Sequence, residues 1–335
     1  MVLQGVDRYR VMEACDESVR VVLAHRGETY SPAYIQGIAG TAFKVAGPCP
    51  CAPTCGDAMP PDKLLRLLGY EIECLSLAAP GTDLKIEGPK LVARVKAEIR
   101  AGRPVIVWHA FTSAEWDVVA GFDEEKHQFL GRGSYAGLDG YATADELRTT
   151  TCGDICPCLG AILVGKRTGV YDAKAAEIAA LRYAVRHAHS DKFPMPADAG
   201  SAPVKWEFRE GRNCYKWWAH KFRADPTKVP DGGSDRYPLG VYRSTHRAAG
   251  EFMLELAAKY PEAKHQFARA AGRFAHEADA LDEIYDGLMG GWSGWQEPDP
   301  AKAEQAAKLL DRAARYYAEG IRDIEDGLGL IAPTA

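Results

Sequence analysis

The residues most able to do chemistry in this chain are its cysteines. The sequence holds nine of them, and eight lie before residue 170. Six form two triplets whose spacings mirror each other: Cys49, Cys51 and Cys55, then Cys152, Cys156 and Cys158. Thiolates are soft ligands that bind zinc, cuprous copper and iron–sulfur clusters. The sequence therefore predicts that four to six of these thiols hold zinc or another thiophilic metal ion.

The spacing within each triplet leaves two other interpretations open. The pairs Cys51–Cys55 and Cys152–Cys156 have the spacing usual for structural zinc, whereas the Cys-x-Cys steps are tighter. Disulfides that join or tighten the two loops would instead require an oxidising compartment. Redox-active or free thiols are the third interpretation.

Charge and hydropathy restrict the classes of partner and the compartment. The chain has 335 residues, with 41 Lys and Arg against 46 Asp and Glu, so its net charge is −5. This mild acidity argues against a chain-wide nucleic-acid surface. No stretch approaches the ~18 apolar residues of a membrane span, and the N-terminal residues lack the apolar run of a secretory signal. We therefore expect a cytoplasmic protein whose thiols are reduced. Its expected partner is a small-molecule or peptide substrate, and a homodimer is a further possible assembly.

The elements that position the cysteines change in kind along the chain. The proline-rich stretch 46–61 is expected to be a rigid loop. Helices are expected at 15–26, 31–45, 62–68 and 88–101. Strands are expected at 70–77, 104–108, 116–122, 127–130 and 158–164. Helices followed by a largely antiparallel sheet are typical of an α+β domain.

The second half is predicted to be helical. Apolar residues recur at helical spacing in 171–190, 240–260 and 306–328, and Asp299 followed by Pro300 is a typical helix start. Such helices pack as a bundle, so we expect two domains, 1–168 and 169–335. The histidines of these helices, among them His246, are predicted to lie on the surface because the Glu-x-x-His pairs of a di-metal bundle are incomplete.

The first 168 residues resemble a known family in the order of five motifs. These are a cysteine at a helix start, Gly-x-x-Gly-x-Ala-Phe, Leu-Gly-Tyr-Glu, Gly-Arg-Pro-Val-Ile-Val and a strand ending in Gly-Phe-Asp: Cys15, 37–43, 68–71, 102–107 and 118–123. This layout resembles the papain-like domain of the butirosin biosynthesis protein H type. At the level of the fold it is also similar to the bacteriocin leader peptidases and to papain. The helical second half is similar to the C-terminal domain that often follows.

The resemblance implies a papain-like fold and a cysteine nucleophile for acyl transfer or amide hydrolysis. Cys15 occupies the nucleophile position, and Gln4 is the candidate upstream donor that would hold the oxyanion. The family's histidine position, six residues before Gly121, holds Glu115 here. The family's Asp or Asn position falls within 131–134, which has neither a carboxylate nor an amide. The implied triad therefore departs from the family pattern at both positions after the cysteine.

A replacement for the missing base is available if the strands at 104–108 and 116–122 form a hairpin. His109 and Glu115 would then lie at the same end of the sheet, and His109 would act as the base with Glu115 orienting it. The opposite interpretation makes His109 a strand cap, Glu115 a solvated acid and Cys15 a small buried residue. Acidic neighbours of Cys15 oppose the thiolate that a nucleophile needs.

Two functions follow from these patterns. The first is a cysteine-dependent acyltransferase or amide hydrolase with an altered triad and Cys15 as its nucleophile. The second is a catalytically altered papain-like protein that binds a thiolate-ligated metal ion or a small ligand through its cysteine loops. A scaffold that binds a partner through the helical half is a third hypothesis, which the sequence does not exclude.

Overall fold

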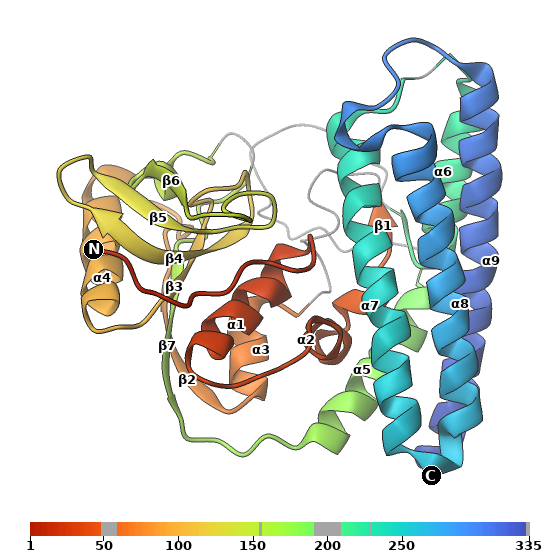
Figure 1. Cartoon of the computed structure of the whole chain (residues 1–335), viewed down its shortest axis with the longest axis horizontal. Helices are drawn as coiled ribbons and strands as arrows, with labels where there is room; N and C mark the ends of the chain where they lie inside the picture. Colours follow the sequence, from red (N-terminus) through yellow and green to blue (C-terminus); the bar gives the residue numbers. More distant parts are fainter. Residues whose placement is uncertain (48–58, 154–155, 191–208, 228, 333–335) are drawn as a thin grey trace. The chain divides into compact units, whose positions relative to one another are not determined.

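The chain folds into two units, and each unit is made of segments that are not consecutive in the sequence. The computed structural model describes residues 1–47, 59–153, 156–190, 209–227 and 229–332 (Figure 1). Of these residues, the first unit comprises 1–32 and the described part of 59–172. The second comprises 33–47, 173–190 and the described part of 209–332. The sequence analysis placed 33–47 in the first domain, whereas the structure groups this segment with the C-terminal helices.

The first unit is built, in its described residues, on a six-stranded antiparallel sheet with the order β2-β7-β3-β4-β5-β6. The strands are β2 Tyr70–Leu75, β3 Val105–Trp108, β4 Trp116–Asp123, β5 Gln128–Arg132, β6 Ala142–Asp145 and β7 Ala161–Arg167. The sequence analysis predicted all of these strands except β6. Every residue of β3 is buried, which explains its uninterrupted apolar sequence. The expected α+β architecture is confirmed.

The α-helices described in this unit are α1 Ala14–His25, α3 Pro61–Leu67 and α4 Leu84–Arg100. α1 contacts β3, β4 and α3, whereas α4 contacts β3, β4 and β7. Glu13 begins α1, because its carboxylate accepts hydrogen bonds from the backbone N–H groups of Cys15 and Asp16, each at 2.9 Å. Val2 forms an antiparallel bridge with Gly121 of β4. The N-terminal segment is therefore fixed against the strand on which the hairpin hypothesis depends.

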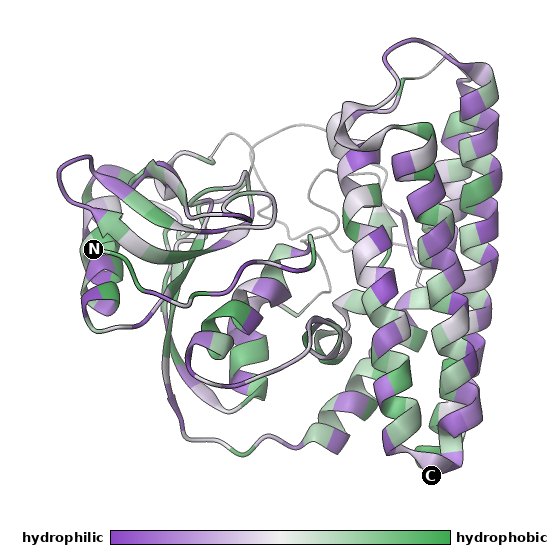
Figure 2. Ribbon diagram, viewed as in Figure 1, coloured by the Kyte–Doolittle hydropathy of each residue, from purple (hydrophilic) through white to green (hydrophobic). Residues whose placement is uncertain are grey.

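The α-helices described in the second unit are α2 Pro32–Ala39, α5 Ala173–Ala188, α6 Arg212–Ala224, α7 Tyr237–Lys259, α8 Lys264–Asp282 and α9 Pro300–Ile331, of which α7, α8 and α9 are the longest. α8 contacts α7 and α9, and α9 also contacts α5 and α6. Figure 2 shows hydrophobic and hydrophilic residues alternating around the long helices, as expected when one side of each is buried. Asp299 caps α9 by accepting hydrogen bonds from the N–H groups of Ala301 and Lys302. The predicted helical character of this half is confirmed.

α9 carries the apolar stripe that the sequence predicted. Its buried residues include Ala306, Leu310, Ala313 and Tyr317, which recur at steps of three and four. Polar residues separate them, so the helix is amphipathic. In the described ranges, no helix is both long and apolar enough to cross a membrane.

The helix predicted at 31–45 ends early. α2 stops at Ala39, and Gly40 has a φ of 82°, a conformation that glycine adopts without a steric penalty. A Cβ at Gly40 would also lie 2.5 Å from the Tyr183 ring. The chain then makes a 3-10 turn at Thr41–Phe43 and enters β1 Ala46–Gly47, which pairs with β8 Arg209–Glu210. The prediction of a helix is wrong beyond residue 39, because the apolar residues that follow lie in this turn and strand.

Candidate functional site

Cys15, the predicted nucleophile, lies in the first turn of α1. Its backbone N–H donates to Glu13, and only 2% of the residue is exposed. Burial raises the pKa of the Cys15 thiol, and the charges of Glu13, Asp16 and Glu115 raise this pKa further. A helix N-terminus favours a thiolate, but burial and the carboxylates outweigh this effect here. Cys15 is therefore a protonated thiol at neutral pH.

His109 and Glu115 meet at one end of the sheet, as the hairpin hypothesis requires. β3 and β4 pair with Trp108 opposite Trp116, and the His109 N–H donates to the Glu115 carbonyl at 2.7 Å. The predicted hairpin is therefore confirmed. The imidazole turns toward its own loop, because its Nδ1 accepts a hydrogen bond from the Ala114 N–H at 2.8 Å.

The surroundings of His109 keep its imidazole neutral. His109 has a φ of 60°, in the left-handed region that few non-glycine residues occupy, and its carbonyl accepts a hydrogen bond from Arg148 at 2.8 Å. Burial lowers the pKa of His109 to about 4, and the charge of Arg148 contributes to this shift. An imidazole with this pKa is a weak base at neutral pH. The geometry therefore gives little support to His109 as a base, and the orienting role of Glu115 stays a prediction.

A buried carboxylate that the sequence analysis missed lies beside the family's Asp or Asn position. Asp117 of β4 accepts hydrogen bonds from the Phe111 N–H at 2.6 Å, the Thr112 N–H at 2.9 Å and the Thr112 hydroxyl at 2.5 Å. Burial raises the pKa of Asp117 to about 7. Gly133 packs against this carboxylate, since a Cβ there would lie 2.4 Å from Asp117 Oδ1. The signal in the sequence was an aspartate inside an apolar strand, because a buried carboxylate needs dedicated partners.

The acidic residues that surround the start of α1 are buried. Glu13, Asp16 and Glu17 are each 0% exposed. Glu17 is paired with Arg20, whose Nε and Nη2 donate to its two oxygens at 2.7 and 2.9 Å. Gln4, the predicted oxyanion donor, is exposed on the N-terminal segment. A developing oxyanion needs hydrogen-bond donors aimed at it, and this region instead concentrates negative charge.

The second cysteine triplet brings its sulfur atoms together. Cys152 and Cys158 are buried, and their Sγ atoms are 3.4 Å apart. The Cys156 N–H donates to the Cys152 carbonyl at 3.0 Å. A hydrogen bond with the Cys156 side chain, together with burial, raises the pKa of the Cys152 thiol. Burial and the hydrogen bond with Cys152 raise the pKa of Cys158 to about 11, although the backbone N–H groups of Cys152 and Gly153 favour the Cys158 thiolate.

The first triplet, Cys49, Cys51 and Cys55, lies outside the described residues. The predicted six-thiol site therefore stays a prediction. Within the described ranges, no group of three or more His, Cys, Asp or Glu side chains is arranged to hold a metal ion. The Cys152–Cys158 pair is thus the part of the predicted site whose geometry is known.

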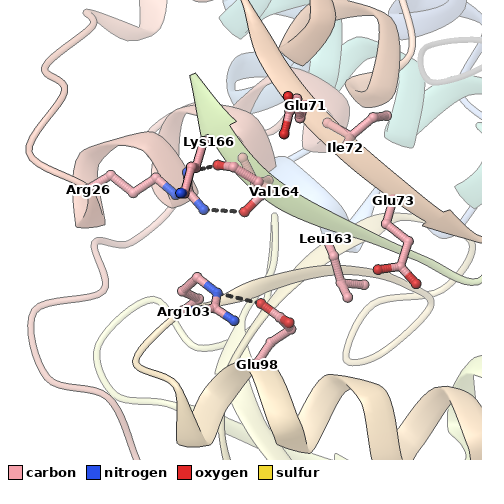
Figure 3. Close-up of a pocket in the computed structure, with 10 residues that line it drawn as sticks. Arg26, Glu71, Ile72, Glu73, Glu98, Arg103, Leu163, Val164 and Lys166 are labelled. Atoms are coloured by element: carbon pink, nitrogen blue, oxygen red, sulfur yellow. Dashed lines mark hydrogen bonds and ion pairs between the residues drawn. The ribbon is translucent and has the colours of Figure 1, made fainter. Parts of the chain in front are cut away.

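A pocket of about 710 Å³ lies beside β2 and β7 (Figure 3). Extending the β3–β7 register from Ile106 opposite Ile162 places Pro104 opposite Val164. Proline has no N–H to donate, and the Arg26 guanidinium donates to the Val164 carbonyl instead. The charged residues that line the pocket are three basic and three acidic ones: Arg26, Arg103, Lys166, Glu71, Glu73 and Glu98. The charges of these side chains therefore balance.

The second unit holds a buried polar cluster that the sequence analysis missed. His246 was predicted to lie on the surface, but it is 0% exposed, so that prediction is wrong. Glu277 accepts hydrogen bonds from His246 Nδ1 at 2.7 Å and from the Tyr215 hydroxyl at 2.6 Å. Burial lowers the pKa of His246, but the charge and hydrogen bond of Glu277 raise it above the ordinary value. The helical spacing could not reveal this cluster, because its members come from α6, α7 and α8.

This cluster and its neighbours hold the backbone of residues 43–46. Among the described contacts, the Phe43 carbonyl accepts from the Tyr317 hydroxyl at 2.9 Å, and the Lys44 carbonyl lies 3.0 Å from His246 Nε2. The Ala46 N–H donates to the Tyr242 hydroxyl at 3.0 Å. A further imidazole, His187, lies 3.0 Å from both backbone groups of Val45. Buried backbone groups whose hydrogen bonds are not all made within a helix or sheet need such partners.

Comparison with known proteins does not add an assignment. A scan against protein-family models found no match, and a search of curated proteins found none.

Proposed function

We propose that this chain is a catalytically altered papain-like protein. It binds a thiophilic metal ion through Cys152 and Cys158. The observation that carries the proposal is the 3.4 Å separation of their Sγ atoms. The papain-like assignment rests on the layout of motifs in the first 168 residues and is supported by the order of α1, the β3–β4 hairpin and the antiparallel sheet.

The geometry of the thiol pair suits a shared metal ion. Two thiolates bound tetrahedrally to one zinc ion at ~2.3 Å lie about 3.8 Å apart. The Cys152 and Cys158 sulfurs therefore need to separate by only a few tenths of an ångström. Both thiols are protonated at neutral pH in the metal-free state, because the pKa of each is raised. A metal ion must displace these protons, so affinity rises with pH.

The surroundings of Cys15 favour this function over acyl transfer or amide hydrolysis. A nucleophilic cysteine needs a lowered pKa or an adjacent base. The pKa of Cys15 is raised by burial and by carboxylates, and the pKa of His109 is about 4. The acyltransferase or hydrolase hypothesis thus depends on a base that the geometry around Cys15 does not support.

A cobalt or cadmium titration of the reduced full-length protein under anaerobic conditions tests the proposal. We expect about one equivalent of metal to bind with sulfur-to-metal charge-transfer absorption, since the two thiols lie close enough to share a single ion. Cys152→Ser and Cys158→Ser should each remove this absorption. Binding should tighten as the pH is raised from about 6 to about 8, because fewer protons then compete with the metal ion for the two sulfur atoms.

The matched control is Cys74→Ser, which removes an exposed thiol of β2. This variant should bind metal as the wild type does. Equal binding by Cys152→Ser and the wild type would overturn the proposal. A disulfide between Cys152 and Cys158 in the freshly purified protein, with no metal bound after reduction, would also count against it.

A further inference from the structure

A second pocket of the first unit differs from the one in Figure 3 in the balance of its charges. It has a volume of about 670 Å³ and is lined by the N-terminal segment, α1, residues 29–30, the end of β5 and the loop that follows. Its charged lining residues are four arginines and two aspartates: Arg8, Arg10, Arg20, Arg132, Asp7 and Asp139. A pocket of this size accommodates a small molecule. The excess of arginines is local, since the chain as a whole is net negative.

We call this pocket the arginine pocket. Arg20 lies on its buried side and is held in place by its partners. Only 4% of its side chain is exposed. Its guanidinium donates to both carboxylate oxygens of Glu17, to Asp7 Oδ2 at 2.8 Å and to the Arg8 carbonyl at 2.7 Å. Arg10 also pairs with Asp7, at 3.0 Å. Glu17 therefore neutralises Arg20, and Asp7 offsets the charge of Arg10.

Arg132 lines another side of the arginine pocket and is held in place without an acidic partner among the described residues. Its Nη1 donates to the carbonyls of Gly137 and Gly140 and its Nε to the Val6 carbonyl at 3.4 Å, and the guanidinium stacks over the Tyr141 ring with 4.3 Å to the ring centroid. Carbonyl groups orient a guanidinium but leave its positive charge in place. In the residues that the structure describes, Arg132 has no ion pair with a carboxylate.

Arg8 supplies a second positive charge that no carboxylate neutralises. Its backbone is fixed, because its N–H donates to Asp7 at 2.9 Å and its carbonyl accepts from Arg20. Its side chain is exposed, and among the described residues its guanidinium has no hydrogen-bond or ion-pair partner. Asp139 is therefore the carboxylate of the pocket lining that has no ion pair among the described residues. One such carboxylate against the two unneutralised arginines, Arg8 and Arg132, leaves the pocket net positive.

We propose that the arginine pocket binds a small molecule through an oxyanion group, either a phosphate or a carboxylate. The planar fork of a guanidinium matches the two oxygens of such a group and forms charge-assisted hydrogen bonds with them. Arg132 is held in a fixed orientation by hydrogen bonds from its Nε and Nη1 to backbone carbonyls, which leaves its Nη2 to donate to the anion, and the exposed Arg8 side chain supplies the fork. This inference is independent of the metal proposal, because it uses none of the cysteines.

Calorimetric titration of the metal-free full-length protein at low ionic strength tests the inference, with inorganic phosphate and succinate as separate probes. We expect one of these anions to bind and its affinity to fall as salt is added. Arg8→Ala should weaken that affinity about tenfold, the scale of one lost charge-assisted contact. Arg8→Lys should recover part of the loss, because it restores the charge without the fork.

Lys166→Ala is the matched control, since Lys166 lines the pocket in Figure 3 whose charges balance. It should leave anion affinity unchanged. Tighter binding of phosphate identifies a phosphate ester as the ligand class, and tighter binding of succinate identifies a carboxylate. The inference is overturned if neither anion binds, if Arg8→Ala binds as the wild type does, or if Lys166→Ala weakens binding equally.

Discussion

The first turn of α1 and the segment 43–46 are both buried and polar, but their charges are arranged in opposite ways. Around Cys15, carboxylates gather beside a thiol, and burial and charge both raise the pKa of that thiol. Around 43–46, Glu277 lies beside His246, and its charge offsets the effect of burial on the pKa of the imidazole. Cys15 of the first region was expected to be catalytic, and His246 of the second was expected to lie on the surface.

This difference teaches that a residue type at a matched position does not establish a catalytic group. Cys15 was expected to be a nucleophile, but its neighbours stabilise the unreactive protonated form. His246, Glu277 and Tyr215 form a complementary hydrogen-bonded network, yet the network is fully buried and holds the backbone of a neighbouring segment. In both regions the sign of the neighbouring charge decides the role, because burial strengthens electrostatic interactions.

The largest expected effect comes from removing the carboxylate of Glu277 from its hydrogen-bonded network with His246 and Tyr215. Glu277→Ala removes the acceptor of both His246 and Tyr215. Loss of one partner from a buried ion pair costs about 3–5 kcal/mol, so the free energy of unfolding in urea should fall by that amount. Glu277→Gln keeps an acceptor and should cost less.

Glu283→Ala is the control for this prediction. Glu283 pairs with Arg312 on the surface, and 45% of its side chain is exposed. An exposed ion pair contributes at most about 1 kcal/mol. If Glu277→Ala and Glu283→Ala reduce stability equally, the buried network does not have the role described above.

A smaller effect is expected for the reactivity of Cys15. In the native protein at neutral pH, iodoacetamide should modify exposed Cys74 first and buried Cys15 at least about tenfold more slowly, since each unit of raised pKa lowers the thiolate fraction tenfold. Glu115→Gln should speed modification of Cys15, because it removes a charge that raises the pKa of the thiol. Mass mapping of labelled peptides measures both rates. Preferential labelling of Cys15 in the wild type would restore the nucleophile hypothesis.

The smallest effect is expected for a single hydrogen bond to the segment 43–46. Tyr317→Phe removes the hydroxyl that donates to the Phe43 carbonyl at 2.9 Å. The net contribution of such a bond is about 1 kcal/mol, and urea unfolding should detect it. Tyr316→Phe, at a half-buried position of the same helix, keeps the aromatic ring and should leave stability unchanged. Equal values for the two variants would show that Tyr317 does not help to hold the segment.

Much of the fold was predictable because local patterns dictate it. The apolar run of β3 and the Asp299–Pro300 start of α9 each identify an element from adjacent residues. The predicted hairpin also formed, because a short connection joins two strands that suit antiparallel pairing. The end of α2 at Ala39 was not predictable in the same way, since it depends on the packing of Gly40 against Tyr183, a residue distant in the sequence.

The candidate site was predictable only in its residue types. Cys152 and Cys158 were identified as members of a candidate ligand triplet, but the spacing favoured Cys152 with Cys156, whereas the structure places the sulfurs of Cys152 and Cys158 3.4 Å apart. The burial of Asp117 and the burial of His246 were both missed, because each depends on contacts between separate elements. The arginine pocket was also missed, since Arg8 and Arg132 are far apart in the chain.

The sequence by itself determined the α+β order of elements, the amphipathic helices of the second half and the positions of the thiols. These properties follow from backbone preferences and from the periodicity of apolar residues, which act over a few neighbouring positions. Only the tertiary structure decided that Cys15 lies among carboxylates, that His109 is neutral and that residues 33–47 group with the C-terminal helices. The physical reason is that burial and the charges of distant residues set the protonation state of a side chain, and both exist only once the chain has folded.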